Sequence, residues 1–399
     1  MSRIIISNAD YPSTLASARI LGKKGHEVFV ADSKRFKIAC YSRFAKYLEC
    51  PSFSDSKQYS DWLVKQQGYF FPASDVAVWY ASSRRKQMKA KTILPSEKTV
   101  NICLFKDKLD AFCRENDIGT PKTYFPVSYS DVKDISRKVN YPCLIKHRTT
   151  VGIVIEKKGQ VVFSPEELVS KYRKDALAYD SAMIKKVCPD VEWPMIQEYV
   201  PGAKENMFNT VGICSRDGIR LIVGKKLRQE PPKLGIGICT TPIKNMDLIP
   251  QAKKLLIKSG YLGPFSMECI YDKRDRRYKV NDMNPRITGV MQLAVANGIN
   301  IPELWYEMFS GKTFRDEVVV GDTVYLRMLA DILYLPGNFL HSRDKISFLR
   351  YLLKSYLGKK QLAIFSASDI KPSLVELVMV LRNKIKHPIR YIKENITGE

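Results

Sequence analysis

The chain of 399 residues lacks any long hydrophobic run. Its purely apolar stretches, such as residues 377–381, are far shorter than the roughly 20 residues that cross a bilayer as a helix. The first residues also lack the apolar segment and the small-residue cleavage site of a signal peptide. These absences predict a cytoplasmic protein without a membrane-spanning segment.

Paired metal-ligating side chains are absent as well. The nine cysteines are scattered without a C-x-x-C pair, and the four histidines, at positions 26, 147, 341 and 387, form no ligand pair. This pattern argues against a disulfide framework, a zinc site and a metal hydrolase, and it favours a reducing compartment. A G-x-G-x-x-G fingerprint is missing too, so a dinucleotide site is not supported.

Acidic residues are scarce relative to basic ones. The chain has 65 Lys and Arg against 41 Asp and Glu, which gives a formal net charge of +24. Such a field attracts nucleotides, nucleic acid, anionic lipid headgroups or an acidic polymer, although a basic solvated surface explains it equally well. Nucleic acid is the least favoured of these partners, because no nucleic-acid-binding motif accompanies the charge.

The spacing of apolar residues predicts a mixed α/β and α+β protein of two or three domains. Residues 4–6 and 28–30 are expected to be strands on either side of a helix. They form a βαβ unit, which predicts a parallel sheet. Residues 122–200 have the pattern of a small α+β unit. Antiparallel strands then follow over 207–284, and basic helices fill 321–399.

Two adjacent strands, 264–272 and 277–284, are predicted to pair as a hairpin. Because side chains alternate between the faces of a strand, each strand presents every second residue to one side. On the shared side we expect Ser266, Glu268 and Ile270 of the first strand and Val280, Asp282 and Asn284 of the second. A register centred on Asp275 places Glu268 opposite Asp282.

Three oxygen ligands, from Glu268, Asp282 and Asn284, converge in this hairpin. Carboxylate and amide oxygens suit Mg²⁺, with Mn²⁺ as an alternative. Two carboxylates that face each other repel, and a divalent cation removes that objection. From the residues alone, an exposed strand face with ordinary polar side chains stays open as the alternative.

Three basic side chains are candidate partners of an anion. Arg286 follows Asn284 closely and is suited to a bidentate contact with a phosphoryl or carboxylate oxygen. Lys146 ends the predicted buried strand 143–146, where an ammonium needs an anion such as a triphosphate. Lys108 lies on a predicted helix at 107–117, where a solvated lysine is the simpler interpretation.

Together these segments resemble the ATP-grasp superfamily over most of the chain. The resemblance rests on five motifs in order: Asp107-Lys108, Tyr-Pro-x-x-x-Lys ending at Lys146, Gln-Glu-Tyr-Val-Pro-Gly at 197–202, Glu268 on a strand, and Asp-x-Asn-Pro-Arg at 282–286. It implies an ATP-grasp fold with three parts. These are a Rossmann-like pre-ATP-grasp domain at 1–95, an ATP-grasp domain at 96–320 with a lid subdomain at about 122–200, and a basic helical C-terminal extension at 321–399.

The resemblance also implies ATP and Mg²⁺ as cofactors, with a role for each site residue. The ATP phosphates would be bound by Lys108, Lys146 and Thr149. The nucleoside would be held by the hinge residues Glu198, Tyr199 and Val200, with Glu205 near the ribose and Ile270 on the adenine ring. Mg²⁺ would be bound by Glu268, Asp282 and Asn284. Arg286 would steady the transferring phosphoryl group, and Arg228 would bind the substrate carboxylate.

A closer similarity, carried by residues 224–232, 348–352 and 363–366, is to the carboxylate–amine ligases that include D-aspartate ligase. It implies ATP-dependent formation of an amide or peptide-like bond through an acyl phosphate. The carboxylate and amine substrates would be small molecules or polymer-linked, with a cell-envelope or other polyanionic precursor among the options.

The alternative is a non-catalytic protein of the same fold that binds a polyanion or an anionic membrane surface. A predicted amphipathic helix supports it, with Ile346, Leu349, Leu353 and Tyr356 on one face and with Lys345, Arg350 and Lys354 nearby. Such a stripe usually docks on its own domain, and this is the interpretation that we favour from the sequence. Peripheral attachment to the inner face of the membrane is the other.

Overall fold

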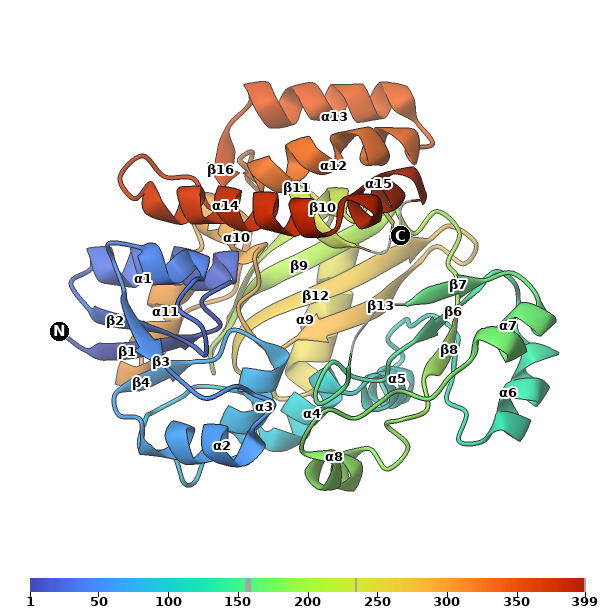
Figure 1. The fold of residues 1–399 in the computed structure, drawn as a ribbon, viewed down its shortest axis with the longest axis horizontal. Helices are drawn as coiled ribbons and strands as arrows, with labels where there is room; N and C mark the ends of the chain where they lie inside the picture. Colours follow the sequence, from blue (N-terminus) through green and yellow to red (C-terminus); the bar gives the residue numbers. More distant parts are fainter. Residues whose placement is uncertain (155–158, 234, 398–399) are drawn as a thin grey trace.

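The computed structural model describes residues 1–154, 159–233 and 235–397. Within them the chain forms three β-sheets: a four-stranded N-terminal sheet, an eight-stranded central sheet and a second four-stranded sheet. Figure 1 shows these sheets from left to right in that order, with the C-terminal helices above them. None of the helices in this described part combines the length and apolar character that a membrane crossing requires.

The N-terminal sheet is parallel, with the strand order β3-β2-β1-β4, and confirms the predicted βαβ unit. The predicted apolar face of the first helix, Leu15, Ala18 and Leu21, is buried. The elements of this region are β1 (Arg3–Ser7), α1 (Pro12–Lys23), β2 (Glu27–Asp32), the 3-10 helix η1 (Ile38–Tyr41), β3 (Lys46–Glu49), α2 (Ser56–Lys65), β4 (Tyr69–Phe71) and α3 (Asp75–Ser83).

The second small sheet is antiparallel, with the order β5-β8-β6-β7. Helices α4 (Glu97–Leu104) and α5 (Lys106–Glu115) lead into it. Its own elements are β5 (Thr123–Tyr124), α6 (Tyr129–Ser136), β6 (Cys143–Lys146), β7 (Gln160–Val162), α7 (Pro165–Lys171), α8 (Ser181–Val187) and β8 (Met195–Glu198). Ser164 caps α7 as its sequence predicts, because the Ser164 hydroxyl accepts the Glu167 N–H.

The central sheet has the strand order β13-β12-β9-β10-β11-β15-β16, with β14 paired to β10. Its strands are β9 (Met207–Cys214), β10 (Ile219–Glu230), β11 (Ile236–Pro242), β12 (Gly263–Asp272), β13 (Arg277–Asn284), β14 (Glu317–Val319), β15 (Val324–Leu326) and β16 (Lys360–Leu362). Both predicted hairpins, β9–β10 and β12–β13, are present.

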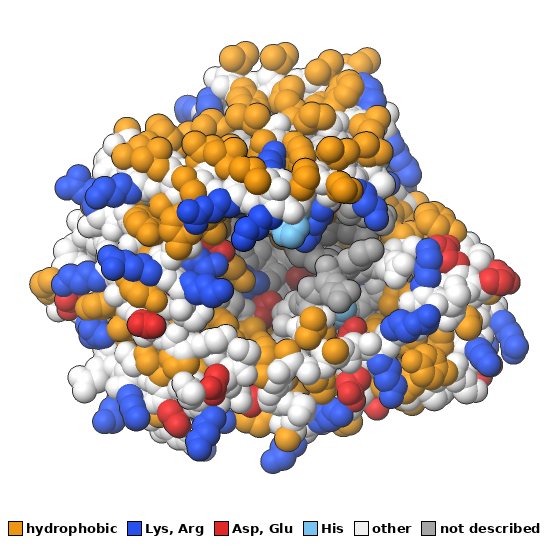
Figure 2. All heavy atoms as spheres, in the orientation of Figure 1, with side chains coloured by type: hydrophobic (Ala, Val, Ile, Leu, Met, Phe, Trp, Pro, Cys, Tyr) orange, Lys and Arg blue, Asp and Glu red, His pale blue; other side chains and the backbone are white. Residues whose placement is uncertain are grey.

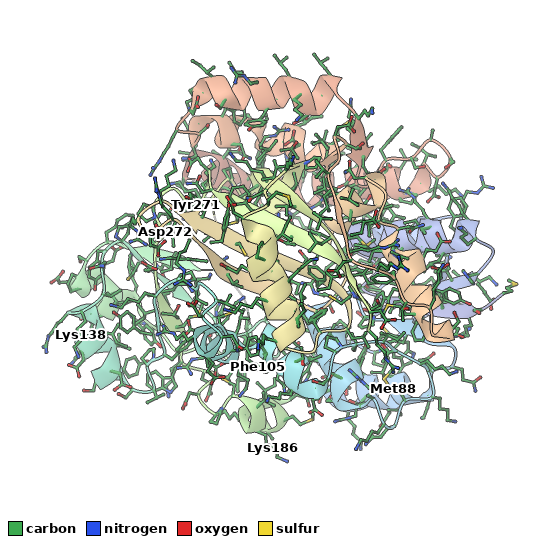
Figure 3. The ribbon with its side chains drawn as sticks, turned by 180° about the vertical axis from the view of Figure 1, so that it is seen from behind. Met88, Phe105, Lys138, Lys186, Tyr271 and Asp272 are labelled. Carbon is green, nitrogen blue, oxygen red and sulfur yellow. The ribbon has the colours of Figure 1, made fainter. Side chains whose placement is uncertain are left out.

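One face of the central sheet is covered by α9 (Leu248–Lys258), which Figure 3 shows lying across the sheet from behind. Alternate strand residues such as Leu221, Met267 and Cys269 pack beneath it and are fully buried. Each such side chain contributes about 1.5–3 kcal/mol on burial. The opposite face is covered near the N-terminal sheet by α10 (Met291–Ala296), α11 (Ile301–Glu307) and η2 (Met308–Ser310).

The C-terminal segment is continuous with the central sheet, because β15 and β16 extend it beyond β11. Its helices are α12 (Met328–Leu340), α13 (Lys345–Leu357), α14 (Lys371–Lys386) and α15 (Pro388–Thr397).

A buried ion pair ties these helices to the sheet. The Arg228 guanidinium on β10 donates to both Asp331 oxygens on α12, at 2.5 and 3.0 Å, and the Tyr356 hydroxyl on α13 donates to Asp331 at 2.7 Å. Arg228 is 1% exposed and Asp331 is fully buried. Arg228 therefore holds the C-terminal helices on the sheet.

This buried pair predicts a characteristic pattern of stability. Arg228→Met leaves the buried Asp331 carboxylate without its ion-pair partner and should lower the free energy of unfolding by about 3–5 kcal/mol. The double variant Arg228→Met/Asp331→Leu removes both charges and should recover most of that loss in denaturant unfolding. A double variant as unstable as the single one would contradict the assignment.

Candidate nucleotide and metal site

The β12–β13 hairpin has the register that the sequence predicts at its polar end. Glu268 lies opposite Asp282, and Ser266 lies opposite Asn284. Glu268 also faces Asn209 on the neighbouring strand β9. The three oxygen-bearing side chains of Glu268, Asp282 and Asn284 therefore lie on adjacent positions of two paired strands.

A β-bulge changes the rest of the predicted face. The register shifts between Glu268 and Cys269, so that Asn281 is an extra residue on β13. Because one extra residue inverts the alternation, Val280 packs with Cys269 in the core under α9. The prediction that Val280 shares a face with Asp282 is wrong for this reason, and Lys279 takes that side instead.

Each of the two carboxylates is paired with a lysine from another element. The Lys226 ammonium on β10 lies 3.0 Å from Glu268 Oε1 and is almost completely buried. Lys106, at the start of α5, pairs with Asp282. Burial alone would raise the pKa of Asp282, but Lys106, and more weakly Lys146 and Arg286, lower it to about 2. Both cations are thus bound to the carboxylates that would hold a metal.

Two further cations complete the site. Lys146, at the end of β6, donates to Gln197 Oε1 and Asn281 Oδ1, both at 3.1 Å. The Arg286 guanidinium lies 2.6 Å from Asp75 of α3 and donates to Asn284 Oδ1 at 2.9 Å. Four cations (Lys106, Lys146, Lys226 and Arg286) thus surround three carboxylates (Asp75, Glu268 and Asp282), and this surplus favours an anionic ligand.

The donor set fits Mg²⁺. Two carboxylates and one amide oxygen are hard oxygen ligands, and they leave coordination positions for phosphate and water. Within the described residues no cluster of three or more His, Cys, Asp or Glu side chains offers a different metal site. All three groups already have a donor, because Lys226 pairs with Glu268, Lys106 pairs with Asp282, and Arg286 donates to the Asn284 amide oxygen.

An apolar platform lies next to the polar group. Val200, Met207 and Ile270 form a small buried cluster with Ala203 against it. Ile270 is two residues from Glu268 on β12, so the platform and the predicted metal ligands share one sheet face. A small apolar cluster beside a group of cations suits a purine base followed by phosphates.

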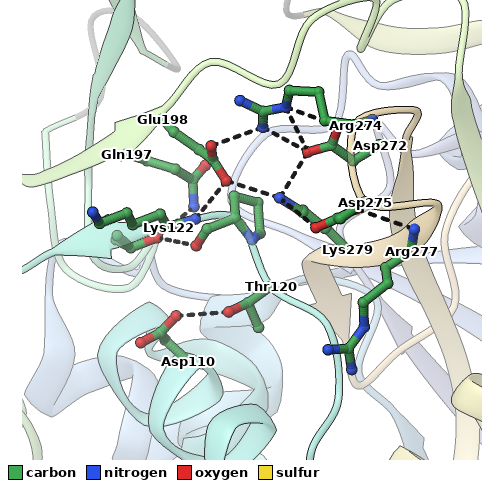
Figure 4. Close-up of polar contacts among 12 residues, drawn as sticks. Asp110, Thr120, Lys122, Gln197, Glu198, Asp272, Arg274, Asp275, Arg277 and Lys279 are labelled. Atoms are coloured by element: carbon green, nitrogen blue, oxygen red, sulfur yellow. Dashed lines mark hydrogen bonds and ion pairs between the residues drawn. The ribbon is translucent and has the colours of Figure 1, made fainter. Parts of the chain in front are cut away.

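The hinge after β8 is locked to the turn of the β12–β13 hairpin by a network of charges (Figure 4). The Glu198 carboxylate accepts from the Lys122 N–H, Arg274 and Lys279, at 2.8, 2.8 and 3.1 Å. Arg274 and Lys279 also reach Asp272, which is 1% exposed. The Glu198 side chain therefore fixes the hinge.

Some predicted residues lie apart from this group. Lys108 lies in the first turn of α5, and its side chain makes no hydrogen bond or ion pair with the described part of the chain. The buried Thr149 hydroxyl accepts the Val151 N–H of its own loop. Arg228 is used by Asp331, and Glu205 lies in the turn after the hinge, where its N–H donates to Gly202.

The sequence interpretation missed Lys106, Lys226 and Asn281. Lys106 stands two residues before Lys108, the lysine of the motif. The sequence does not show that the Lys106 side chain points toward Asp282, because this depends on where α5 begins. Lys226 had a usable signal, because on an inner strand it alternates with Gly224, which lies on the Glu268 side of the sheet. Asn281 reaches Lys146 through the bulge, which left no mark in the sequence pattern.

No protein-family model matches the chain, and no curated protein matches it. Solved structures do. An N5-carboxyaminoimidazole synthetase from Staphylococcus aureus, complexed with ADP, has a TM-score of 0.63 at 12% identity, over 87% of this chain and 86% of that chain. A biotin carboxylase from Campylobacter jejuni, in complex with βγ-ATP, has 0.60 at 16%, over 81% and 74%.

A third similar structure is an L-amino acid ligase from Bacillus licheniformis, with a TM-score of 0.56 at 14% identity, over 77% of this chain and 74% of that chain. At these identities the likeness concerns the fold. The three sheets and these matches define an ATP-grasp fold, as the sequence motifs predict.

The hinge network predicts a pH dependence of stability. Hydrogen bonds from Arg274, and then from Lys279, hold the pKa of Asp272 below its usual range. Its contribution is therefore complete above the unfolded pKa of about 4 and is lost as pH falls through the lower folded value.

Asp272→Asn should reduce the fall in unfolding free energy between about pH 5 and pH 2, measured by denaturant unfolding at a series of pH values. Asp134→Asn, in a surface pair with Arg137, is the control and should leave that slope unchanged. Equal slopes in wild type and Asp272→Asn would refute the role of the network.

Proposed function

We propose that the protein is an ATP-dependent carboxylate–amine ligase that releases ADP and phosphate. The observation that carries this proposal is the opposed pair Glu268 and Asp282, each bound to a lysine, beside an apolar platform on one sheet face. The likeness to an ADP-bound synthetase and an L-amino acid ligase supports it.

In this proposal Glu268, Asp282 and Asn284 hold Mg²⁺, which when bound neutralises charge on the ATP phosphates. Val200 and Ile270 pack against the adenine, and the backbone of Glu198 to Val200 borders it. Lys146 binds a phosphate. With the carboxylates engaged by a metal, Lys106 and Lys226 would be available to donate to the phosphates.

The reaction proceeds in two steps. A carboxylate oxygen of the substrate attacks the γ-phosphorus, the bond to the β–γ bridging oxygen breaks, and ADP leaves. The amine nitrogen then attacks the carbonyl carbon of the acyl phosphate, inorganic phosphate leaves, and the nitrogen loses a proton. Positioning and charge neutralisation carry the catalysis, and Arg286 steadies the transferring phosphoryl group.

The substrates are proposed only by class. A carboxylate and an amine, free or polymer-linked, are consistent with the group of cations at the site and with the similarity to the D-aspartate ligase branch in the sequence. A cell-envelope or other polyanionic precursor is consistent with the net charge of +24. Because Arg228 is enclosed with Asp331, we do not propose it as a ligand of the substrate carboxylate.

The rival proposal is a protein that keeps the fold and binds ATP, or only a polyanion, without catalysis. The two differ in ADP release. A ligase releases ADP over repeated turnovers only when both its carboxylate and its amine are present, and a binding protein releases none with any member of a substrate panel.

Glu268→Gln should lower substrate-dependent ADP release at least about 100-fold, because it removes a charge aimed at the transition state. Glu303→Gln is the matched control. Glu303 is also paired with a lysine, and its side chain is 27% exposed against 25% for Glu268, so this variant should keep full activity. Equal ADP release by the Glu268→Gln variant and wild type would refute the proposed site.

A further inference from the structure

The outer surface of the C-terminal helices is unusually apolar. On α13 an exposed stripe with helical spacing runs through Ile346, Leu349, Leu353 and Leu357, which are 75, 50, 60 and 80% exposed. The prediction that the stripe of this helix docks on its own domain is therefore wrong for Ile346, Leu349 and Leu353. Phe348 and Tyr356 face inward instead.

A second stripe continues over two helices. It consists of Leu374, Leu377, Val378, Leu381 and Ile385 on α14 and of Ile389, Ile392 and Ile396 on α15, all of them exposed. The spacing of three or four residues is kept from α14 into α15. The inner side of α14 is occupied by buried Val375 and Glu376, so the stripe is its outward face.

We call the two stripes together the C-terminal apolar face. Figure 2 shows hydrophobic side chains gathered over these helices, with Lys and Arg along their borders and a hollow in the molecule directly below. Contiguous exposed apolar surface of this extent marks a docking surface in soluble proteins.

The exposed charged residues within α13, α14 and α15 are basic. Exposed basic residues flank the stripes, including Arg350 and Lys354 on α13, Arg382 and Lys386 on α14, and Lys393 on α15. The acidic residues within these three helices, Glu376 and Glu394, are held by Arg327 and by Tyr334 with Arg390. The face therefore offers apolar and cationic groups together.

We propose that the C-terminal apolar face binds the surface of an anionic lipid bilayer. Apolar stripes with basic flanks are the pattern of helices that lie in the headgroup region, where the stripe enters the acyl boundary and the flanks meet anionic headgroups. The helices are too short to span, with 13, 16 and 10 residues. A second copy of the chain is disfavoured as occupant, because the same cations would then oppose one another.

This inference does not depend on ATP chemistry, since the face lies outside the nucleotide site. If both hold, docking brings the hollow of Figure 2 next to the lipid surface, where a lipid-linked or surface-bound substrate would be reached.

The test is flotation of the full-length protein with vesicles, without nucleotide, at low and high salt. Wild type should bind phosphatidylcholine–phosphatidylglycerol vesicles at low salt, with roughly tenfold weaker binding to pure phosphatidylcholine or at high salt. Two triple variants should each reduce binding to the anionic vesicles at least about tenfold: Leu349→Glu/Leu353→Glu/Leu357→Glu and Leu381→Glu/Ile385→Glu/Ile389→Glu. These side chains are exposed, so the variants should keep the wild-type melting temperature.

Phe163→Glu/Met246→Glu/Ile257→Glu is the matched control, because these residues are equally exposed (66, 55 and 66%) but lie on the lid and near α9. It should bind like wild type. No binding at low salt, or equal loss in the control, would overturn the proposal. So would a concentration-dependent dimer in solution that the stripe variants dissolve, since the face would then be an interface between copies.

Discussion

Two carboxylates on neighbouring strands, Glu268 and Asp282, face each other across the β12–β13 hairpin. Like charges at such positions destabilise a sheet unless cations compensate them. Lys226 and Lys106 supply that compensation from β10 and α5, and so draw four segments of the chain to one point. The requirement to balance these two charges fixes the arrangement of the strands and helices around them.

The strand β10 carries this constraint in two directions. Lys226 pairs with Glu268 on one face of the sheet. A bulge between Lys226 and Arg228 turns Arg228 to the other face, where it pairs with Asp331 of α12. One strand therefore contacts both the predicted metal ligand Glu268, through Lys226, and the C-terminal helices, through Arg228. At the other end of the site, Asp75 of the N-terminal region binds both Arg286 and the Thr150 hydroxyl. Asp75 thus connects the N-terminal region to the loop after β6.

Regular alternation allowed the sequence to predict the hairpins, the parallel N-terminal sheet and the opposition of Glu268 and Asp282. Features that interrupt this alternation could not be predicted from the sequence. The bulge at Asn281 turned Val280 into the core and Lys279 toward Glu198, and no residue type marks a bulge in a single sequence. Lys106 and the enclosure of Arg228 depend on tertiary contacts with segments over a hundred residues away, which local patterns do not encode. The exposure of the apolar stripe on α13 could not be predicted either, because an amphipathic pattern does not show whether another element packs against the apolar side of a helix.

A crystal structure with Mg²⁺ and a non-hydrolysable ATP analogue tests the central claim most directly. The account predicts metal density between Glu268 and Asp282, with adenine against Val200 and Ile270. It also predicts that Lys106 and Lys226 have moved from the carboxylates to phosphate oxygens. Nucleotide bound elsewhere, with the Lys226–Glu268 and Lys106–Asp282 pairs intact, would contradict it.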